Sequence, residues 1–172
     1  GDQGMIIVTT KSIANESKKM QEFVAEKEKR GFFVDIATED DFGGADKYGP
    51  EKAFLIKSYL EKVHDKYRYL LLIGNPNPQT GNIPMFQAKL FKTNPCAALG
   101  YDCSIAETDH FYANFTSNWD ANSNGLYGEM SGDTVDLEET LIPGRIHVYF
   151  DEVENLDKVL ETTIKYMNEK KA

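Results

Sequence analysis

The chain of 172 residues is long enough for one domain with a real core, and two complete domains would be cramped. Hydrophobic residues make up 41% and aromatic residues 12% of it, which excludes a disordered chain. The net charge of −9, from 28 acidic and 19 basic residues, argues against a nucleic-acid partner, because phosphate binding requires a basic face. No apolar run approaches the roughly 20 residues that a membrane-spanning helix needs.

The first half of the sequence alternates short apolar runs with helical patterns. Residues 5–10 (MIIVTT) and 32–37 (FFVDIA) are apolar runs typical of buried strands. Between them, one helical pattern spans residues 13–31 and ends at a glycine. A second helix is predicted to begin at Gly49–Pro50, with proline in its first turn, and residues 69–73 (YLLLI) form the clearest strand. This β-α-β-α-β order predicts parallel strands with helices on both faces.

The second half is less regular. Residues 75–143 are rich in Pro, Asn, Gly and Asp, and we interpret them as a long loop or hairpin excursion. Regular structure resumes with a predicted strand at 145–150, and a last helix begins at Asp151 with Glu154 completing a capping box. We therefore expect a single domain over 1–172, a three-layer α/β/α fold with a mostly parallel four-stranded sheet. The predicted buried stripe of the last helix is Val153, Leu156, Leu160, Ile164 and Met167.

The sharpest local signal is the segment 120–126, DANSNGL. It places oxygen side chains at alternate positions, then a glycine, then a residue whose backbone carbonyl can point inward, as in the first half of a calcium loop. Position twelve holds Ser131 instead of the bidentate glutamate of an EF-hand, and two nearby acids can supply the missing carboxylate. A solvated turn is the alternative, because turns use the same residue types. The predicted ligands of a structural Ca²⁺ are Asp120, Asn122, Asn124, Leu126, Glu129 and Asp133.

Cysteine catalysis needs a thiolate, a histidine within hydrogen-bond reach and an oxyanion hole. Cys96 and Cys103 lie close together in a turn-rich stretch, and two interpretations stay open: separate thiols, or a disulfide that closes a small loop. The histidines are His64, His110 and His147, and no glycine-rich anion cradle lies near any of them. We predict no catalytic dyad in this chain and, without a phosphate loop after the first strand, no cofactor-binding residue.

Several segments resemble those of one enzyme family. LLLIGNP at 70–76, with Ile-Pro at 83–84, resembles the "LLLVGDP … IP" segment of gingipain-like cysteine peptidases. TDHFYA at 108–113 resembles their "TDYYYA", residues 119–129 resemble their "WDANGNGxYGE" loop, and PGRIHV at 143–148 resembles "VGRIPV". The departures are Asn75 for the usual aspartate, His110 for a tyrosine and His147 for a proline.

The resemblance implies a caspase-like catalytic region of two α/β halves, of which this chain is the first. The catalytic histidine of the family, in a Gly-His-Gly context, and its cysteine belong to the second half, and no Gly-His-Gly occurs here. The implied role is the non-catalytic N-terminal half of a secreted or cell-surface cysteine endopeptidase. Its partners would be the catalytic C-terminal subdomain of the same polypeptide and a protein or peptide substrate. Calcium is a common companion of these enzymes.

Two other interpretations compete with this one. A flavodoxin-like enzyme would hold a phosphate or cofactor at the strand ends, near Thr10 or Gly74. A stand-alone, calcium-dependent binding or adhesion module would present an exposed aromatic patch to its partner. The aromatic residues concerned are Phe111, Tyr112, Phe115 and Trp119.

Overall fold

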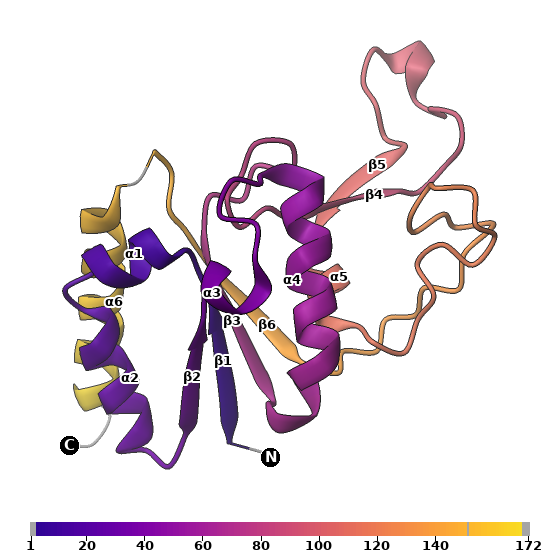
Figure 1. The fold of residues 1–172 in the computed structure, drawn as a ribbon. Coiled ribbons are helices and arrows are strands. Elements are labelled where there is room, and N and C mark those ends of the chain that lie inside the picture. Colours follow the sequence, from indigo (N-terminus) through magenta and orange to yellow (C-terminus); the bar gives the residue numbers. More distant parts are fainter. Residues whose placement is uncertain (1–2, 151, 170–172) are drawn as a thin grey trace.

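The computed structural model describes residues 3–150 and 152–169. They form three layers, with a four-stranded parallel sheet between two layers of helices, as predicted (Figure 1). The strand order is β2-β1-β3-β6, so β1 and β3 are central and β2 and β6 are the two edges. The strands are β1 (Gly4–Val8), β2 (Phe33–Ala37), β3 (Tyr69–Gly74) and β6 (Ile142–His147).

Helices cover both faces because alternate residues of the strands point to opposite sides. Ile6 and Val8 of β1 pack toward α4, while Met5 and Ile7 pack toward α2 and α6. The first layer contains α3 (Glu39–Phe42) and α4 (Gly49–Val63), followed by the short 3₁₀ helix η1 (His64–Lys66). The second contains α1 (Lys11–Glu16), α2 (Met20–Glu28) and α6 (Val153–Glu169). No helix in the described part of the chain is both long and apolar enough to cross a membrane.

The prediction of one helix over 13–31 is wrong, because the chain forms two helices, α1 and α2. The hydroxyl of Ser17 donates to Asp157 at 2.6 Å, and the amides of Lys18 and Lys19 donate to the same carboxylate at 3.0 and 3.2 Å. The amides of Lys18 and Lys19 therefore bond to a side chain of α6 instead of to carbonyls of a continuous helix. A local periodicity does not reveal the break, because the acceptor lies about 140 residues further along the chain.

The predicted strand at 145–150 is shifted by three residues. Pairing with β3 runs from Tyr69 opposite Ile142 to Gly74 opposite His147, so β6 begins earlier and ends before Phe150. The buried stripe of α6 is confirmed at its first four positions, and Met167 is partly buried. The predicted cap, Asp151, lies outside the described residues.

The excursion between β3 and β6 contains an antiparallel hairpin, which projects away from the body of the domain (Figure 1). Its strands are β4 (Phe86–Lys89) and β5 (Ile105–Thr108), with the 3₁₀ helix η2 (Ala97–Leu99) at the tip, and α5 (His110–Ala113) follows. The rings of Phe86 and Phe111 stack at 3.8 Å in the main core. Three of the four aromatic residues named above are buried there and Phe115 packs against them, so they form no exposed patch.

Candidate functional site

Three of the family-like segments meet at Arg145 on β6. Its guanidinium donates to both carboxylate oxygens of Asp109, each at 2.7 Å, and to the carbonyl of Ile83 at 2.6 Å. The carbonyl of Pro84 lies at 3.4 Å and also accepts a hydrogen bond from the hydroxyl of Tyr112 at 2.6 Å. The Arg145 side chain is only 5% exposed. The motif residues therefore fasten the excursion to the edge of the sheet, a structural role that sequence reasoning did not identify.

A second node holds the excursion to α4. The ammonium group of Lys57 donates to the carbonyls of Phe111 and Asn114 at 2.7 and 2.5 Å, and it lies 3.9 Å from the ring centroid of Phe115. Burial lowers the pKa of Lys57 to about 8. The neutral amine keeps two hydrogens, enough for both carbonyls. Sequence analysis did not single out Lys57, because a lysine in an amphipathic helix is normally solvated.

Lys57 is expected to make the domain more stable as the pH rises from about 8 toward 10.5. Above pH 8 the unfolded chain binds a proton at this lysine that the folded chain has lost, so the free energy of unfolding increases with pH. Urea unfolding at pH 7 and pH 9.5 tests this, with Lys57→Met as the comparison. A rise of the same size in both proteins would contradict the assignment.

The predicted calcium loop has a well-defined backbone. The carboxylate of Asp120 accepts the amides of Asn124 at 2.9 Å and Gly125 at 3.2 Å. The amide of Asn124 also donates to the side chain of Asn122, and the amide of Leu126 donates to the side chain of Asn124. Ser123 and Gly125 have positive φ angles of 56° and 77°, so the chain turns sharply here. The alternating pattern thus builds a tight turn of successive side-chain-to-amide bonds.

Glu129 contacts this loop through its side chain, which is bonded to two asparagines, and is only 2% exposed. Its Oε2 accepts the side-chain amides of Asn122 at 3.0 Å and Asn124 at 2.5 Å, which lower the pKa of the carboxyl. Its Oε1 is buried, with no hydrogen-bond partner among the described residues. A buried carboxylate oxygen without a partner is unfavourable, and a bound cation would compensate it.

The residues present fit a hard cation. Carboxylates and side-chain amide oxygens are the donors that Ca²⁺ prefers, and each asparagine oxygen here keeps a second lone pair beside the backbone amide that it accepts. The structure brings Asp120, Asn122, Asn124 and Glu129 together, and Leu126 joins them through its amide. In the described ranges, no three acidic, histidine or cysteine side chains gather at one point. Two carboxylates assisted by amides indicate weak affinity.

Asp133, also a predicted ligand, has a different position. Its Oδ1 accepts the amide of Ala121 at 2.8 Å, and its Oδ2 accepts the amides of Gly128 and Glu129, both at 2.8 Å. The carboxylate of Asp133 thus accepts three backbone amides and links the beginning of the loop to its end. Asp133 therefore fixes the backbone on either side of Glu129.

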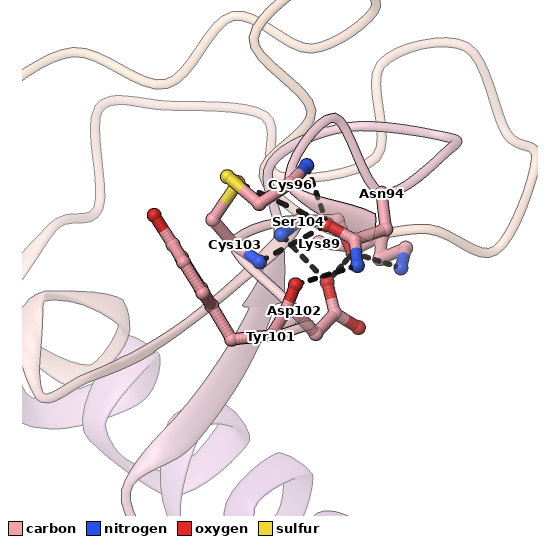
Figure 2. The surroundings of a disulfide bond; sticks show 7 residues. All are labelled: Lys89, Asn94, Cys96, Tyr101, Asp102, Cys103 and Ser104. Carbon is pink, nitrogen blue, oxygen red and sulfur yellow. Dashed lines mark hydrogen bonds between the residues drawn. A yellow bond between two sulfur atoms is a disulfide. The ribbon is translucent and has the colours of Figure 1, made fainter. Parts of the chain in front are cut away.

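The two cysteines form a disulfide at the tip of the hairpin, which decides between the two interpretations left open by the sequence. Figure 2 shows the side chain of Asn94 inside the loop. Its carbonyl oxygen accepts the amides of Cys96 and Cys103 at 2.9 and 3.2 Å, and its nitrogen donates to the carbonyl of Tyr101 at 2.9 Å. Neither cysteine is a free thiol.

The three histidines have different contacts. The ring of His64 stacks on Phe115 with centroids 4.4 Å apart. His110 contacts the carbonyl of Asp136 through Nε2 at 2.8 Å. His147 is exposed at the end of β6. With both sulfurs bonded, none of them has a thiol to activate.

Fold and site together define a parallel α/β domain with a long excursion. The ion pair of Arg145 with Asp109 and the hydrogen bonds of Lys57 hold the excursion to the domain, and a disulfide closes the tip of its hairpin. Comparison with known families gives a match to Peptidase family C25 over residues 1–172, the whole chain. No curated protein and no solved structure gives a significant match. The chain belongs to peptidase family C25, the gingipain family of cysteine peptidases. The resemblance carried by its motifs is thereby confirmed.

Proposed function

We propose that this chain is the non-catalytic N-terminal half of a gingipain-like cysteine endopeptidase, and that it packs against and supports a catalytic half of the same polypeptide. The observation that carries the proposal is the disulfide between the only two cysteines of the sequence. A cysteine peptidase needs a thiolate, and this member of the family has no sulfur left to provide one. The nucleophile must then come from outside the 172 residues.

The proposal includes secretion or display at the cell surface. Structural disulfides persist in oxidising environments outside the cytosol, and the Cys96–Cys103 bond fits that setting. A calcium site with few charges also suits the millimolar calcium levels used by extracellular modules.

The proposal is tested on the native protein in its source organism, with an antibody raised against this domain. We expect a product much larger than the 172-residue chain, and thiol-dependent peptidase activity that copurifies with it. The isolated chain should show no such activity before or after reduction. Replacing both Cys96 and Cys103 by alanine in the larger product should leave its activity within about twofold, since neither would be the nucleophile. Peptidase activity of the isolated chain, or a native product of 172 residues, would refute the proposal.

We also propose that Asp120, Asn122, Asn124 and Glu129 hold a structural Ca²⁺, with the carbonyl of Leu126 as a further donor. The buried, unpartnered Oε1 of Glu129 supports this. The ion would neutralise that carboxylate and cross-link the loop, which packs against the hairpin through the bond from the Lys89 amide to the Tyr127 carbonyl at 2.7 Å. Its contribution would be to the stability of the excursion.

Calcium at about 100 times its dissociation constant should raise the melting temperature by roughly 5–10 °C, because such an excess stabilises a folded protein by about 2.7 kcal/mol. A chelator should reverse the shift. Glu129→Gln should abolish it, while Glu107→Gln on β5 should leave it unchanged. Differential scanning calorimetry measures the melting temperature of the protein with calcium and with chelator, and of each variant in millimolar calcium. A melt that does not respond to calcium would remove the metal from this loop.

A further inference from the structure

The outer edge of β6 carries unpaired backbone groups. The amides of Ile142 and Val148 donate to carbonyls on the β3 side, those of Arg68 and Gly74, at 2.8 and 3.0 Å. In a parallel strand, alternate residues direct their amide and carbonyl to the same neighbour, so those of Arg145 and His147 point away from β3. No hydrogen bond among the described residues engages these two amides. An edge of this kind can accept another strand.

Three exposed aromatic side chains continue this edge. The rings of His147 and Tyr149 lie 5.7 Å apart between centroids, and those of Tyr149 and Phe150 lie 6.5 Å apart. Tyr149 is 45% exposed and Phe150 is 88% exposed. They stand at the carboxyl end of the sheet, where β6 leads into the connection to α6 (Figure 1). Open α/β folds assemble their binding sites at this end.

Phe150 also has an unusual backbone. Its φ angle is 50°, in the left-handed region that glycine and asparagine populate and that is strained for a bulky aromatic residue. Burial does not compensate the strain, because the side chain is almost fully in solvent. A partner that covers Phe150 would supply the burial that offsets the strain of its backbone.

Charge supports the same conclusion. Residues 141–150 contain no acidic residue, in a chain whose net charge is −9, and the charge of their one arginine is neutralised by Asp109. The centres of protein interfaces are depleted in acidic residues and enriched in tyrosine and phenylalanine. The free edge and the exposed aromatic residues that follow it therefore carry no acidic side chain.

We propose that an extended strand of the catalytic half pairs with the free edge of β6, and that its apolar side chains cover Tyr149 and Phe150. This inference rests on the proposed function and names the surface that the two halves share. A second copy of this chain fits less well. Two β6 strands paired about Arg145 would set each Pro143, which has no amide hydrogen, opposite the carbonyl of His147. A strand of different sequence avoids that loss.

The test compares hydrogen exchange in the isolated 172-residue chain and in the native, larger polypeptide. We expect the amides of Arg145 and His147 to exchange at least about tenfold more slowly in the larger polypeptide, while the hairpin tip, 96–103, exchanges equally in both. Equal exchange at residues 143–149 in both proteins would overturn the surface but leave the proposed function standing. A native product of 172 residues would remove the proposed function, and this partner with it.

Phe150→Gly separates a contact role from a structural one. Glycine adopts the observed φ without strain, so the isolated chain should melt at the same or a higher temperature. In the larger polypeptide, the same change should reduce the protection of His147. Tyr101→Ala at the hairpin tip is the control, with no effect on either readout. Destabilisation of the isolated chain by Phe150→Gly, or a dimer of that chain in sedimentation that protects His147, would overturn the inference.

Discussion

Replacing Arg145 with methionine is expected to lower the free energy of unfolding by about 3–5 kcal/mol, because it leaves the carboxylate of Asp109 and the carbonyl of Ile83 without their donor in a largely buried position. Breaking one partner of a buried pair is more damaging than removing both, since the remaining charge stays desolvated. Urea unfolding, followed by circular dichroism, measures the loss.

Two variants make this expectation specific. Asp109→Leu combined with Arg145→Met should recover part of the loss, because no charge then remains unpaired. Arg68→Met removes an arginine that is exposed at the start of β3 and should change stability by less than about 1 kcal/mol. If Arg145→Met proved as mild as Arg68→Met, the ion pair would not be what holds the excursion to the sheet.

The parallel sheet was predictable because its signals are local. Runs such as 5–10 and 69–73 are apolar, short and bounded by turn residues, and Gly49–Pro50 marks the start of α4 correctly. Errors arose where a distant residue intervenes. Asp157 breaks the first predicted helix, and the register against β3 moves β6 toward the N-terminus.

The candidate site shows the same division. The alternating oxygen side chains from Asp120 to Asn124 are visible in the sequence, and they do build the loop. The sequence does not reveal which way each acidic side chain points. The carboxylate of Asp133 points to backbone amides, while that of Glu129 points to the side chains of two asparagines. Likewise, the motifs contain Asp109 and Arg145, but nothing in their spacing of 36 residues indicates a contact.

Asn114→Leu is expected to lower the free energy of unfolding by about 2–4 kcal/mol and to loosen the excursion. Asn114 is fully buried, and its side-chain oxygen accepts the amide of Ser117 at 3.3 Å and the indole nitrogen of Trp119 at 3.1 Å. Its nitrogen donates to the carboxylate of Asp136 at 2.7 Å and to the carbonyl of Glu138 at 2.8 Å. Leucine has a similar volume, so lost hydrogen bonds and not a cavity would cause the effect.

Trp119 is the only tryptophan of the chain, so its fluorescence reports on this node directly. An indole that loses its buried acceptor should turn toward water, and we expect its emission to shift to longer wavelength in Asn114→Leu under native conditions. The matched control is Thr116→Val, which removes an exposed hydroxyl that accepts from Asn114 at 3.2 Å and donates to the carboxylate of Asp136 at 3.1 Å, and leaves the bond from Asn114 to Trp119 in place. Because the hydroxyl is exposed, this change should cost less than about 1 kcal/mol without a shift. An unshifted spectrum with unchanged stability in Asn114→Leu would mean that the aromatic core alone holds the excursion. In that case the hydrogen bonds of Asn114 would follow from the packing of Phe86, Phe111 and Trp119 instead of directing it.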